Sequence, residues 1–456
     1  MSETLIVILA VVLVLGIAIN IHEFGHFIVA KIFGMRVEAY SFFGLGPRLC
    51  GFKIGNTDYR ISAIPLGAYV KLYGDEATSS LEGGESTADR VPDSELYELR
   101  PRWQKFLVML GGPFMNIVLA IAIPFGGALY LGVPAMPAPV VDLVIKGGAS
   151  DVAGVQVGDR IVEFAGRENP TWQNISDEAL ISPEKNLSMV VERGGERIPL
   201  TVIPAKIVQG GSSLGDLGLR PDEGAEPVVV RGTQPQSAAA GAGLEAGDAV
   251  ISLNGVAVRN TNDVINRIRS GQGSALDLIV ERNGQRLSLS IQPVKDSTDG
   301  IWRIGASFAP GEVKARDKAS IVSAFAFAAD ENLRIVAMTG RVFGQMFSGE
   351  RSVKDAGLAG PVGIVQLIAQ VVTQGGFAGF LSILAVISLN LGVFNLLPIP
   401  MLDGGQIALL GIDKVASWFG GALSNSVKEK INMVGLAIVL SLMVLTLYLD
   451  VSRLFF

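Results

Sequence analysis

Two histidines, the only ones in the chain, stand four residues apart in the segment His22-Glu23-Phe24-Gly25-His26. On a helix, residues i and i+4 lie one above the other, so both imidazoles can face one metal ion. Glu23 points about 100° away around the helix, where its carboxylate can activate a water at that metal. The spacing predicts a zinc centre with Glu23 as the general base.

A catalytic zinc ion needs three protein ligands and one open position for water. Because there is no third histidine, the candidates are Cys50 and Asp403. Cys50 falls in a predicted loop and is interpreted as a packing residue; as the single cysteine, it also excludes an internal disulfide. Asp403 follows a long apolar stretch and is the better candidate. The predicted site therefore holds one zinc ion between His22, His26 and Asp403.

Four apolar stretches are long enough, or nearly so, to span a bilayer. The chain of 456 residues is 49% hydrophobic and has a mean hydropathy of +0.44, which is typical of a protein that is part membrane and part soluble. A shorter apolar run over 321–329 predicts a helix on the membrane surface. The predicted spans cover about 5–33, 106–131, 377–397 and 431–449.

Basic residues near these stretches predict the orientation of the chain in the membrane. Ten Lys and Arg residues lie between positions 31 and 105, which places that loop in the cytoplasm. Both termini and the segment 132–376 are then expected outside, with the zinc residues near the cytoplasmic ends of their helices. The net charge of −6, without a basic stripe, argues against a nucleic-acid partner.

The outer segment contains an internal repeat, which predicts two copies of one domain. Residues 154–166 align with residues 243–255, and the same offset relates 191–193 to 280–282. In each copy a Gly-Asp pair opens a turn, an apolar run follows as a strand, and a second glycine turn ends it. We therefore expect a mainly β insert made of two similar domains.

The order of these elements resembles the site-2 protease family of intramembrane zinc metalloproteases. The resemblance covers nearly the whole chain: His-Glu-x-x-His in the first membrane helix, Asn-x-x-Pro-x-Pro-x-Leu-Asp-Gly over 395–404, and the repeated insert between them. It implies hydrolysis of peptide bonds in single-span membrane proteins, with trimmed anti-sigma factors and remnant signal peptides as substrate classes. It also implies a multi-pass protein of the bacterial inner membrane, with both termini and the insert in the periplasm.

The resemblance implies roles for residues around the zinc ligands. Asn395, Pro398 and Pro400 match positions of the element that contacts substrate, although a simple helix stop would also explain the prolines. Gln406 departs from the family pattern, where histidine is expected. Because the set of three ligands is already complete, this departure affects the residues that support the ligands and not the ligands themselves.

Three further segments match the family. Gly44-Leu45-Gly46 begins a segment that resembles a membrane re-entrant β-loop presenting a strand edge to substrate; an ordinary glycine turn is the alternative. The segment 112–116 resembles a motif of the second helix, and its asparagine, Asn116, needs a hydrogen-bond partner within the membrane. The segment 358–362 resembles another family element, to which the sequence assigns no chemistry.

The insert resembles a tandem of circularly permuted PDZ domains, because of the run 237–248 and an apolar-Gly-apolar triplet near the end of each copy. A PDZ groove binds an extended peptide by adding it to a sheet edge, so peptide C-termini are one expected class of partner. The alternative is that the domains only block access or brace the membrane part. The expected peptide-binding turns are Leu217, Gly218, Leu219, Ile304, Gly305 and Ala306.

Together these features predict a polytopic α-helical membrane protein with about four transmembrane helices, a membrane re-entrant β-loop and an inserted tandem of circularly permuted PDZ domains. The alternatives are a non-catalytic PDZ scaffold that binds protein C-termini, a membrane-anchored protease of soluble substrates, and a zinc transporter. The expected domains are 1–131 (first membrane half), 132–221 and 222–310 (PDZ domains), 311–375 (membrane-surface helix region) and 376–456 (second membrane half).

Overall fold

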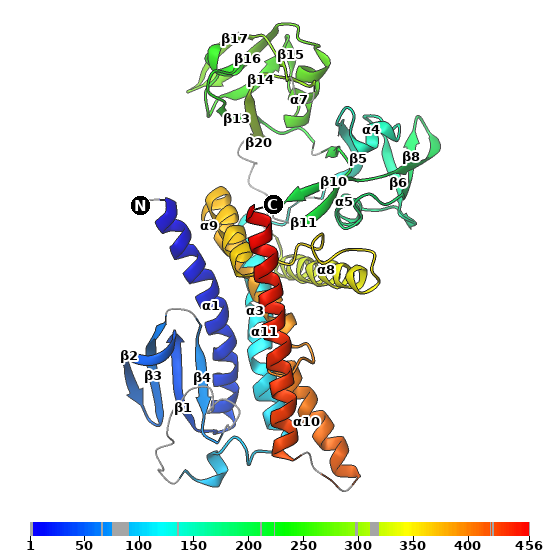
Figure 1. The fold of residues 1–456 in the computed structure, drawn as a ribbon. Helices are drawn as coiled ribbons and strands as arrows, with labels where there is room; N and C mark the ends of the chain where they lie inside the picture. The colour runs from blue at the N-terminus through cyan, green and yellow to red at the C-terminus, as the bar shows by residue number, and fades with distance from the viewer. Residues whose placement is uncertain are drawn as a thin grey trace. The chain divides into compact units, whose positions relative to one another are not determined.

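The computed structural model describes residues 3–64, 67–74, 91–134, 136–209, 212–222, 224–296, 300–310, 319–419, 421 and 424–455. The beginning of the expected surface-helix region, 311–318, lies outside them. The chain forms two compact units, one from Met1–Tyr130 with Lys318–Phe456 and one from Leu131–Asp317. Figure 1 shows long helices in the first unit and small sheets in the second.

Four helices of the first unit are long and apolar enough to cross a membrane. The four predicted spans are thus confirmed by length and composition. One of them starts earlier than expected, at Pro361 instead of about 377, and is interrupted at Gly376, where a φ of +55° suits glycine. The four helices are α1 (Glu3–Ile32), α3 (Arg102–Leu131), α9 (Pro361–Asn395) and α11 (Asn425–Phe455).

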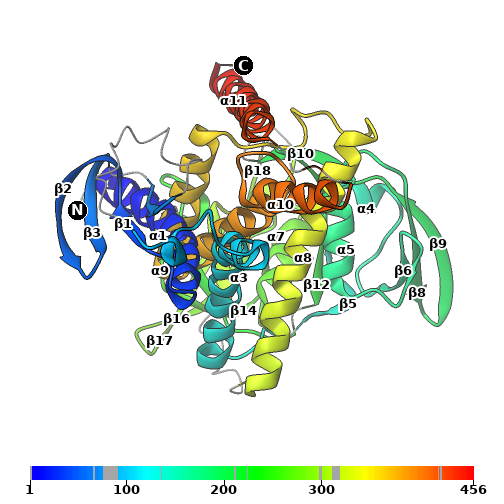
Figure 2. The same cartoon turned by 90° about the horizontal axis from the view of Figure 1, so that it is seen from below.

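Among the described residues, this unit also contains the helices α8 (Ile321–Phe347) and α10 (Asp403–Trp418). α8 runs across the bundle rather than along it (Figures 1 and 2), and with 27 residues it extends well beyond the expected 321–329. The side chain of Asn332 donates to the carbonyl of Ala120 on α3. Pro124 leaves that carbonyl without its helical N–H donor, so the amide fills a gap that the proline creates.

A four-stranded sheet packs against α1, with the strand order β2-β3-β1-β4. Phe27 of α1 and Tyr40 of the sheet share its core. β2 forms the edge and is exposed along its whole length. Cys50 is exposed on this strand, so its interpretation as a packing residue in a loop is wrong. The strands are β1 (Val37–Phe43), β2 (Leu45–Ile54), β3 (Thr57–Ile64) and β4 (Tyr69–Leu72), and a short 3-10 helix, η1 (Asp93–Glu95), follows.

The second unit contains two domains with the same order of elements. In each, the last strand pairs with the first, β12 with β5 and β20 with β13, and one longer helix lies between the strands. The first has β5 (Ala138–Val144), α4 (Ala149–Val152), β6 (Arg160–Phe164), β7 (Arg167–Glu168), α5 (Trp172–Leu180), β8 (Leu187–Arg193), β9 (Glu196–Val202), β10 (Ala205–Gln209), β11 (Ser212–Asp216) and β12 (Leu219–Asp222). The second has β13 (Val228–Thr233), α6 (Ala238–Gly241), β14 (Ala249–Leu253), β15 (Val256–Ala257), α7 (Thr261–Ser270), β16 (Leu276–Arg282), β17 (Gln285–Ile291), β18 (Val294–Lys295), β19 (Trp302–Arg303) and β20 (Ala306–Pro310).

The repeated Gly-Asp pairs of the sequence place a buried carboxylate opposite an arginine in each domain. Asp159 accepts two hydrogen bonds from Arg193, and Asp248 accepts two from Arg282. The hydrogen bond from Arg282 lowers the pKa of Asp248. Burial raises the pKa of Asp159, but the bonds from Arg193 and a backbone amide outweigh it, so this pKa is lowered too. The repeat thus preserves an ion pair as well as a turn.

Candidate metal centre

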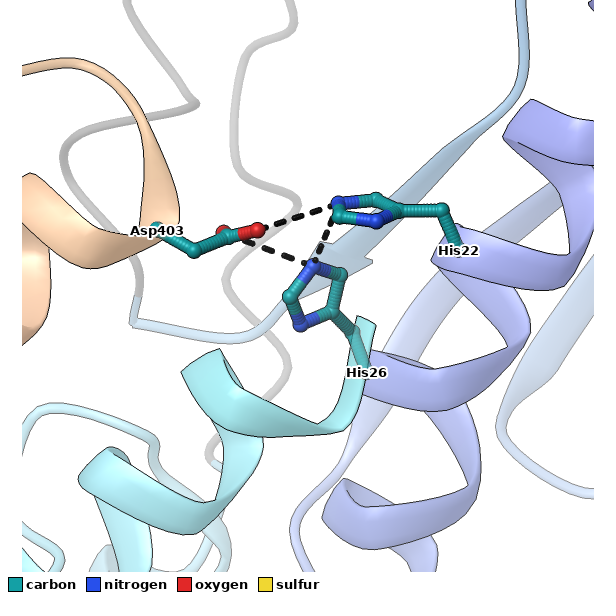
Figure 3. A group of neighbouring side chains, drawn as sticks. All are labelled: His22, His26 and Asp403. Carbon is teal, nitrogen blue, oxygen red and sulfur yellow. Dashed lines mark hydrogen bonds and ion pairs between the residues drawn. The ribbon is translucent and has the colours of Figure 1, made fainter. Parts of the chain in front are cut away.

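The three predicted ligands converge on one point (Figure 3). His22 and His26 lie one turn apart on α1, and Asp403 is the first residue of α10. The Nε2 atoms of the histidines are 3.2 Å apart, and the carboxylate oxygens of Asp403 lie 3.0 Å from His22 Nε2 and 3.4 Å from His26 Nε2. Tetrahedral zinc with bonds of about 2.0–2.2 Å separates its ligand atoms by about 3.4 Å. The donor set therefore fits one zinc ion.

Glycines bring the backbone of α3 against the two imidazoles. A Cβ atom at Gly25 would overlap the backbone of Gly111, and one at Gly112 would overlap the ring of His26 and approach that of His22. Only glycine allows helices to approach this closely without displacing one of them. Gly25 lies inside the His-Glu-x-x-His motif, so the motif supplies the helix contact as well as the ligands.

The ring of His26 is oriented by a backbone carbonyl. Its Nδ1 atom lies 2.7 Å from the carbonyl oxygen of Val108 on α3. Since a carbonyl only accepts, Nδ1 carries the proton and donates, and Nε2 is left unprotonated toward the metal position. Sequence reasoning missed this contact because a backbone carbonyl leaves no residue type to recognise.

The ring of His22 is oriented by Asn116, whose side chain is fully buried. The Asn116 side-chain amide lies 3.2 Å from His22 Nδ1. In the structure the amide nitrogen faces Nδ1, and the amide oxygen accepts from Ser388. With Nε2 bound to a metal, Nδ1 carries the proton and needs an acceptor, so the amide is then turned with its oxygen toward Nδ1 and its nitrogen toward Ser388 Oγ; the two amide atoms are assigned by such hydrogen-bond logic. Ser388 on α9 donates to the backbone carbonyl of Asn116 and fixes it from the other side. The sequence indicated that Asn116 needs a partner, and His22 is that partner.

Glu23 and Asn395 border the same point. Glu23 lies within direct electrostatic range of both histidines and of Asp403, beside the backbone amide of Val70 on β4. The side-chain nitrogen of Asn395, the last residue of α9, is 3.2 Å from His22 Nε2. The structure therefore gathers the carboxylate of Glu23, the three candidate ligands and the amide of Asn395 around one position.

The other predicted site residues lie elsewhere or at the border of this cluster. Pro398 and Pro400 lie in the loop that joins α9 to α10, between Asn395 and Asp403. Gly44, Leu45 and Gly46 lie at the start of β2, and the atoms nearest to the two glycines belong to Ser62 and Ile64 of β3. The six predicted peptide-binding residues lie in the second unit, just before or at the start of β12 and β20.

A comparison with family models bears on the whole chain. The model described as Peptidase family M50 matches residues 10–442. The chain belongs to peptidase family M50. It is a zinc metalloprotease of the site-2 type, which acts in regulated intramembrane proteolysis, and the resemblance noted in the sequence is confirmed.

Curated M50-type relatives match along their full length. The chain is 29% identical over 469 residues to the regulator of sigma-E protease RseP of Escherichia coli, covering 97% of this chain and 98% of the relative. It is 29% identical over 470 residues to the protease RseP of Yersinia pestis, covering 98% of each. A Vibrio cholerae protein whose curated name assigns it provisionally to the zinc metalloproteases is 28% identical over 482 residues, covering all of both chains. This M50 enzyme is accordingly a multi-pass protein of the inner membrane.

Two of the solved structures that match the chain cover short parts of it. The PDZ domain of an SdrC-like protein from Listeria monocytogenes covers 18% of this chain and 88% of its own, with 21% identity and a TM-score of 0.18. The second domain of another Listeria protein covers 21% of this chain and 94% of its own, with 20% identity and a TM-score of 0.18. These likenesses are too small to assign a ligand to the insert.

Proposed function

We propose that His22, His26 and Asp403 hold a single zinc ion in this M50 protease and that Glu23 is its general base. The observation that carries the proposal is the convergence of one ligand atom from each of the three residues within 4.8 Å of one another. The three distances, 3.0, 3.2 and 3.4 Å, lie at or slightly below the edge of about 3.4 Å that zinc bonds of about 2.1 Å imply for a tetrahedral site.

Bound zinc supplies a Lewis acid that polarises the scissile carbonyl and activates a water. Glu23 takes the proton of the attacking water and delivers it to the leaving amine. Val108 and Asn116 hold the two imidazoles in the orientation that turns Nε2 toward the metal. The amide of Asn395, beside the ligands, donates a hydrogen bond to the substrate backbone.

The proposed substrates are single-span membrane proteins whose helix unwinds locally, since a helical carbonyl is otherwise occupied by its own hydrogen bond. Pro398 and Pro400 leave nearby carbonyls without helical donors, so their loop can adapt to an unwound strand. We assign the sheet with the exposed edge β2 as the re-entrant β-loop, where Gly44, Leu45 and Gly46 begin the edge that pairs with the freed strand. The names of the RseP relatives favour trimmed anti-sigma factors, and remnant signal peptides share the same single-span form.

We further propose that the insert is a pair of circularly permuted PDZ domains on the periplasmic side, together with both termini. The pairing of the last strand with the first in each copy supports the permutation. In the first copy the N–H of Gly218 already donates to Asp216, whose charge repels a peptide carboxylate. The residue before the second triplet is instead Arg303, whose guanidinium pairs with Asp296. The second copy, with Ile304, Gly305 and Ala306, is therefore the better candidate for binding C-termini.

The proposal is tested by co-expressing a tagged single-span substrate without its outer domain together with wild type or Glu23→Gln. Wild type is expected to cleave, and the variant is expected to lose at least about 100-fold in rate, as for the loss of a general base, while it still binds zinc. Glu38→Gln, on β1 and paired with Lys71, is the matched control and should cleave normally. Equal cleavage by wild type and Glu23→Gln would refute the role of Glu23 and favour a PDZ scaffold acting beside another protease.

A further inference from the structure

The loop between α9 and α10 is held between two glycines from different helices. On one side Gly405 of α10 lies against Ile399, and a Cβ atom there would overlap the Ile399 carbonyl. On the other side Gly435 of α11 lies against Pro400, and a Cβ atom there would overlap both the carbonyl and the ring of that proline. Each glycine thus contacts a backbone carbonyl of the loop, so neither glycine can gain a side chain unless the loop moves.

The same loop contains a strained residue. Met401 has a φ of +80°, in the left-handed region that a residue with a side chain rarely adopts. Such a conformation costs about 1–3 kcal/mol and persists only where the surroundings impose it. Met401 stands one residue after Pro400 and two before Asp403, so the packing that imposes it also sets the direction in which the Asp403 ligand leaves the loop.

A hydrogen bond joins α11 to the start of α10. The Nε2 atom of Gln406 donates to the Oδ1 atom of Asn432 over 3.2 Å. Asn432 and Gly435 are three residues apart on α11 and share one face, and Gln406 and Asp403 have the same relation on α10. Gln406 is the position at which the chain departs from the family pattern, and here its side chain contacts α11.

Few residues of α11 are buried, with only 17% in its most apolar window, and a further junction lies near its C-terminal end, where Asp450 accepts from the amides of Gly360 and Gly363. Large side chains along it, such as Met433, Val434 and Val444, are more than half exposed. The contact of Gly435 with Pro400 is thus a local junction within a loosely packed helix.

We propose that α11 positions the Asp403 ligand and the Pro398–Pro400 loop, through Gly435 seated on Pro400 and Asn432 bonded to Gln406. The inference rests on the proposed zinc site. Gly435, Asn432 and Gln406 act through Asp403 and the loop, so they are positioning residues. Loss of such outer support typically weakens metal binding about 10–100-fold.

The test is the variant Gly435→Ala in the purified full-length protein, with zinc affinity measured by competition with a chromophoric chelator. The d–d absorption of the Co²⁺-substituted protein reports the ligand geometry independently of activity. Gly435→Ala is expected to bind zinc at least about 10-fold more weakly and to shift the Co²⁺ band. Gly411→Ala is the matched control, because a Cβ atom at that glycine of α10 meets nothing within 4 Å. Its zinc affinity and its Co²⁺ band should match those of wild type.

A second pair of variants avoids any steric insertion. Gln406→Leu and Asn432→Leu each remove one side of the hydrogen bond, and each is expected to weaken zinc binding by about 3–10-fold, the value of one neutral hydrogen bond. The double variant should lose no more zinc affinity than the weaker-binding of the two single variants, since each single substitution already removes the same hydrogen bond.

The outcomes separate this inference from the zinc site itself. If His22→Ala leaves zinc affinity unchanged in the full chain, the proposed site is wrong. If His22→Ala abolishes binding while Gly435→Ala keeps both the wild-type affinity and the Co²⁺ band, the site stands and the positioning role of α11 is overturned. If Gly435→Ala does not fold, the leucine variants decide: unchanged affinity in both overturns the inference, and a non-additive loss supports it.

Discussion

Asn116→Ala removes the contact that orients the ring of His22. Asn116 is fully buried, and its side-chain amide lies 3.2 Å from His22 Nδ1. In the variant the Nδ1 proton loses its acceptor in a site that water does not easily reach. A buried polar group left unsatisfied costs about 1–3 kcal/mol, which corresponds to a zinc affinity about 5- to 150-fold weaker at about 1.4 kcal/mol per tenfold.

The assay is chelator competition in detergent or nanodiscs, together with single-turnover cleavage of a trimmed single-span substrate. The control is Asn332→Ala, which also truncates a buried asparagine that bonds to α3, but at the Ala120 carbonyl away from the ligands. It should lower stability and leave zinc affinity within about twofold of wild type, since ΔΔG values of separate sites add. Equal zinc affinities for wild type, Asn116→Ala and Asn332→Ala would refute the orienting role of Asn116.

Three further predictions concern other contacts. Gly25→Val should drive the valine side chain into the backbone of Gly111. This clash should lower the free energy of unfolding by at least about 1–3 kcal/mol and weaken zinc binding. A thermal melt like that of wild type would contradict the helix contact. Asp248→Asn should speed hydrogen exchange in β14 and β16 more at neutral pH than in acid. The hydrogen bond from Arg282 lowers the pKa of Asp248, so its stabilisation of the fold is present above the ordinary value of about 3.9 and disappears as pH falls through the lowered value of the folded state. An equal effect across that pH range would speak against the ion pair. Asp450→Ala should fray the start of α9, because its carboxylate accepts from the amides of Gly360 and Gly363; loss of such a cap costs about 1 kcal/mol, and unchanged exchange at 364–368 would count against it.

The three residues that the structure brings together could be selected from sequence. His22 and His26 share a helix face through their four-residue separation alone, and Asp403 comes soon after an apolar stretch. Asn116, Val108 and Gly435 could not be assigned in this way. Their roles depend on how closely α3 and α11 approach their neighbours, and a single sequence does not give the distance between helices.

The limits of the predicted fold have similar causes. α9 begins before the expected stretch because Gln366, Gln370 and Gln374 dilute its apolar character without breaking the helix. α8 continues past the charges at 330–334, where Arg334 pairs with Glu331 and Asn332 bonds to α3. The repeat, in contrast, was visible at once, since the pairs Asp159–Arg193 and Asp248–Arg282 recur at the same spacing.

The proposed ligands lie far apart in the sequence, two on α1 and one at the start of α10. A chain emerging from the ribosome therefore inserts its histidines long before Asp403 is synthesised, and two imidazoles alone do not complete a catalytic zinc site. If α11 also sets the position of Asp403, α11 must enter the bilayer before the site is complete. Newly made enzyme would thus remain inert beside the other proteins entering the membrane until α11 has been inserted.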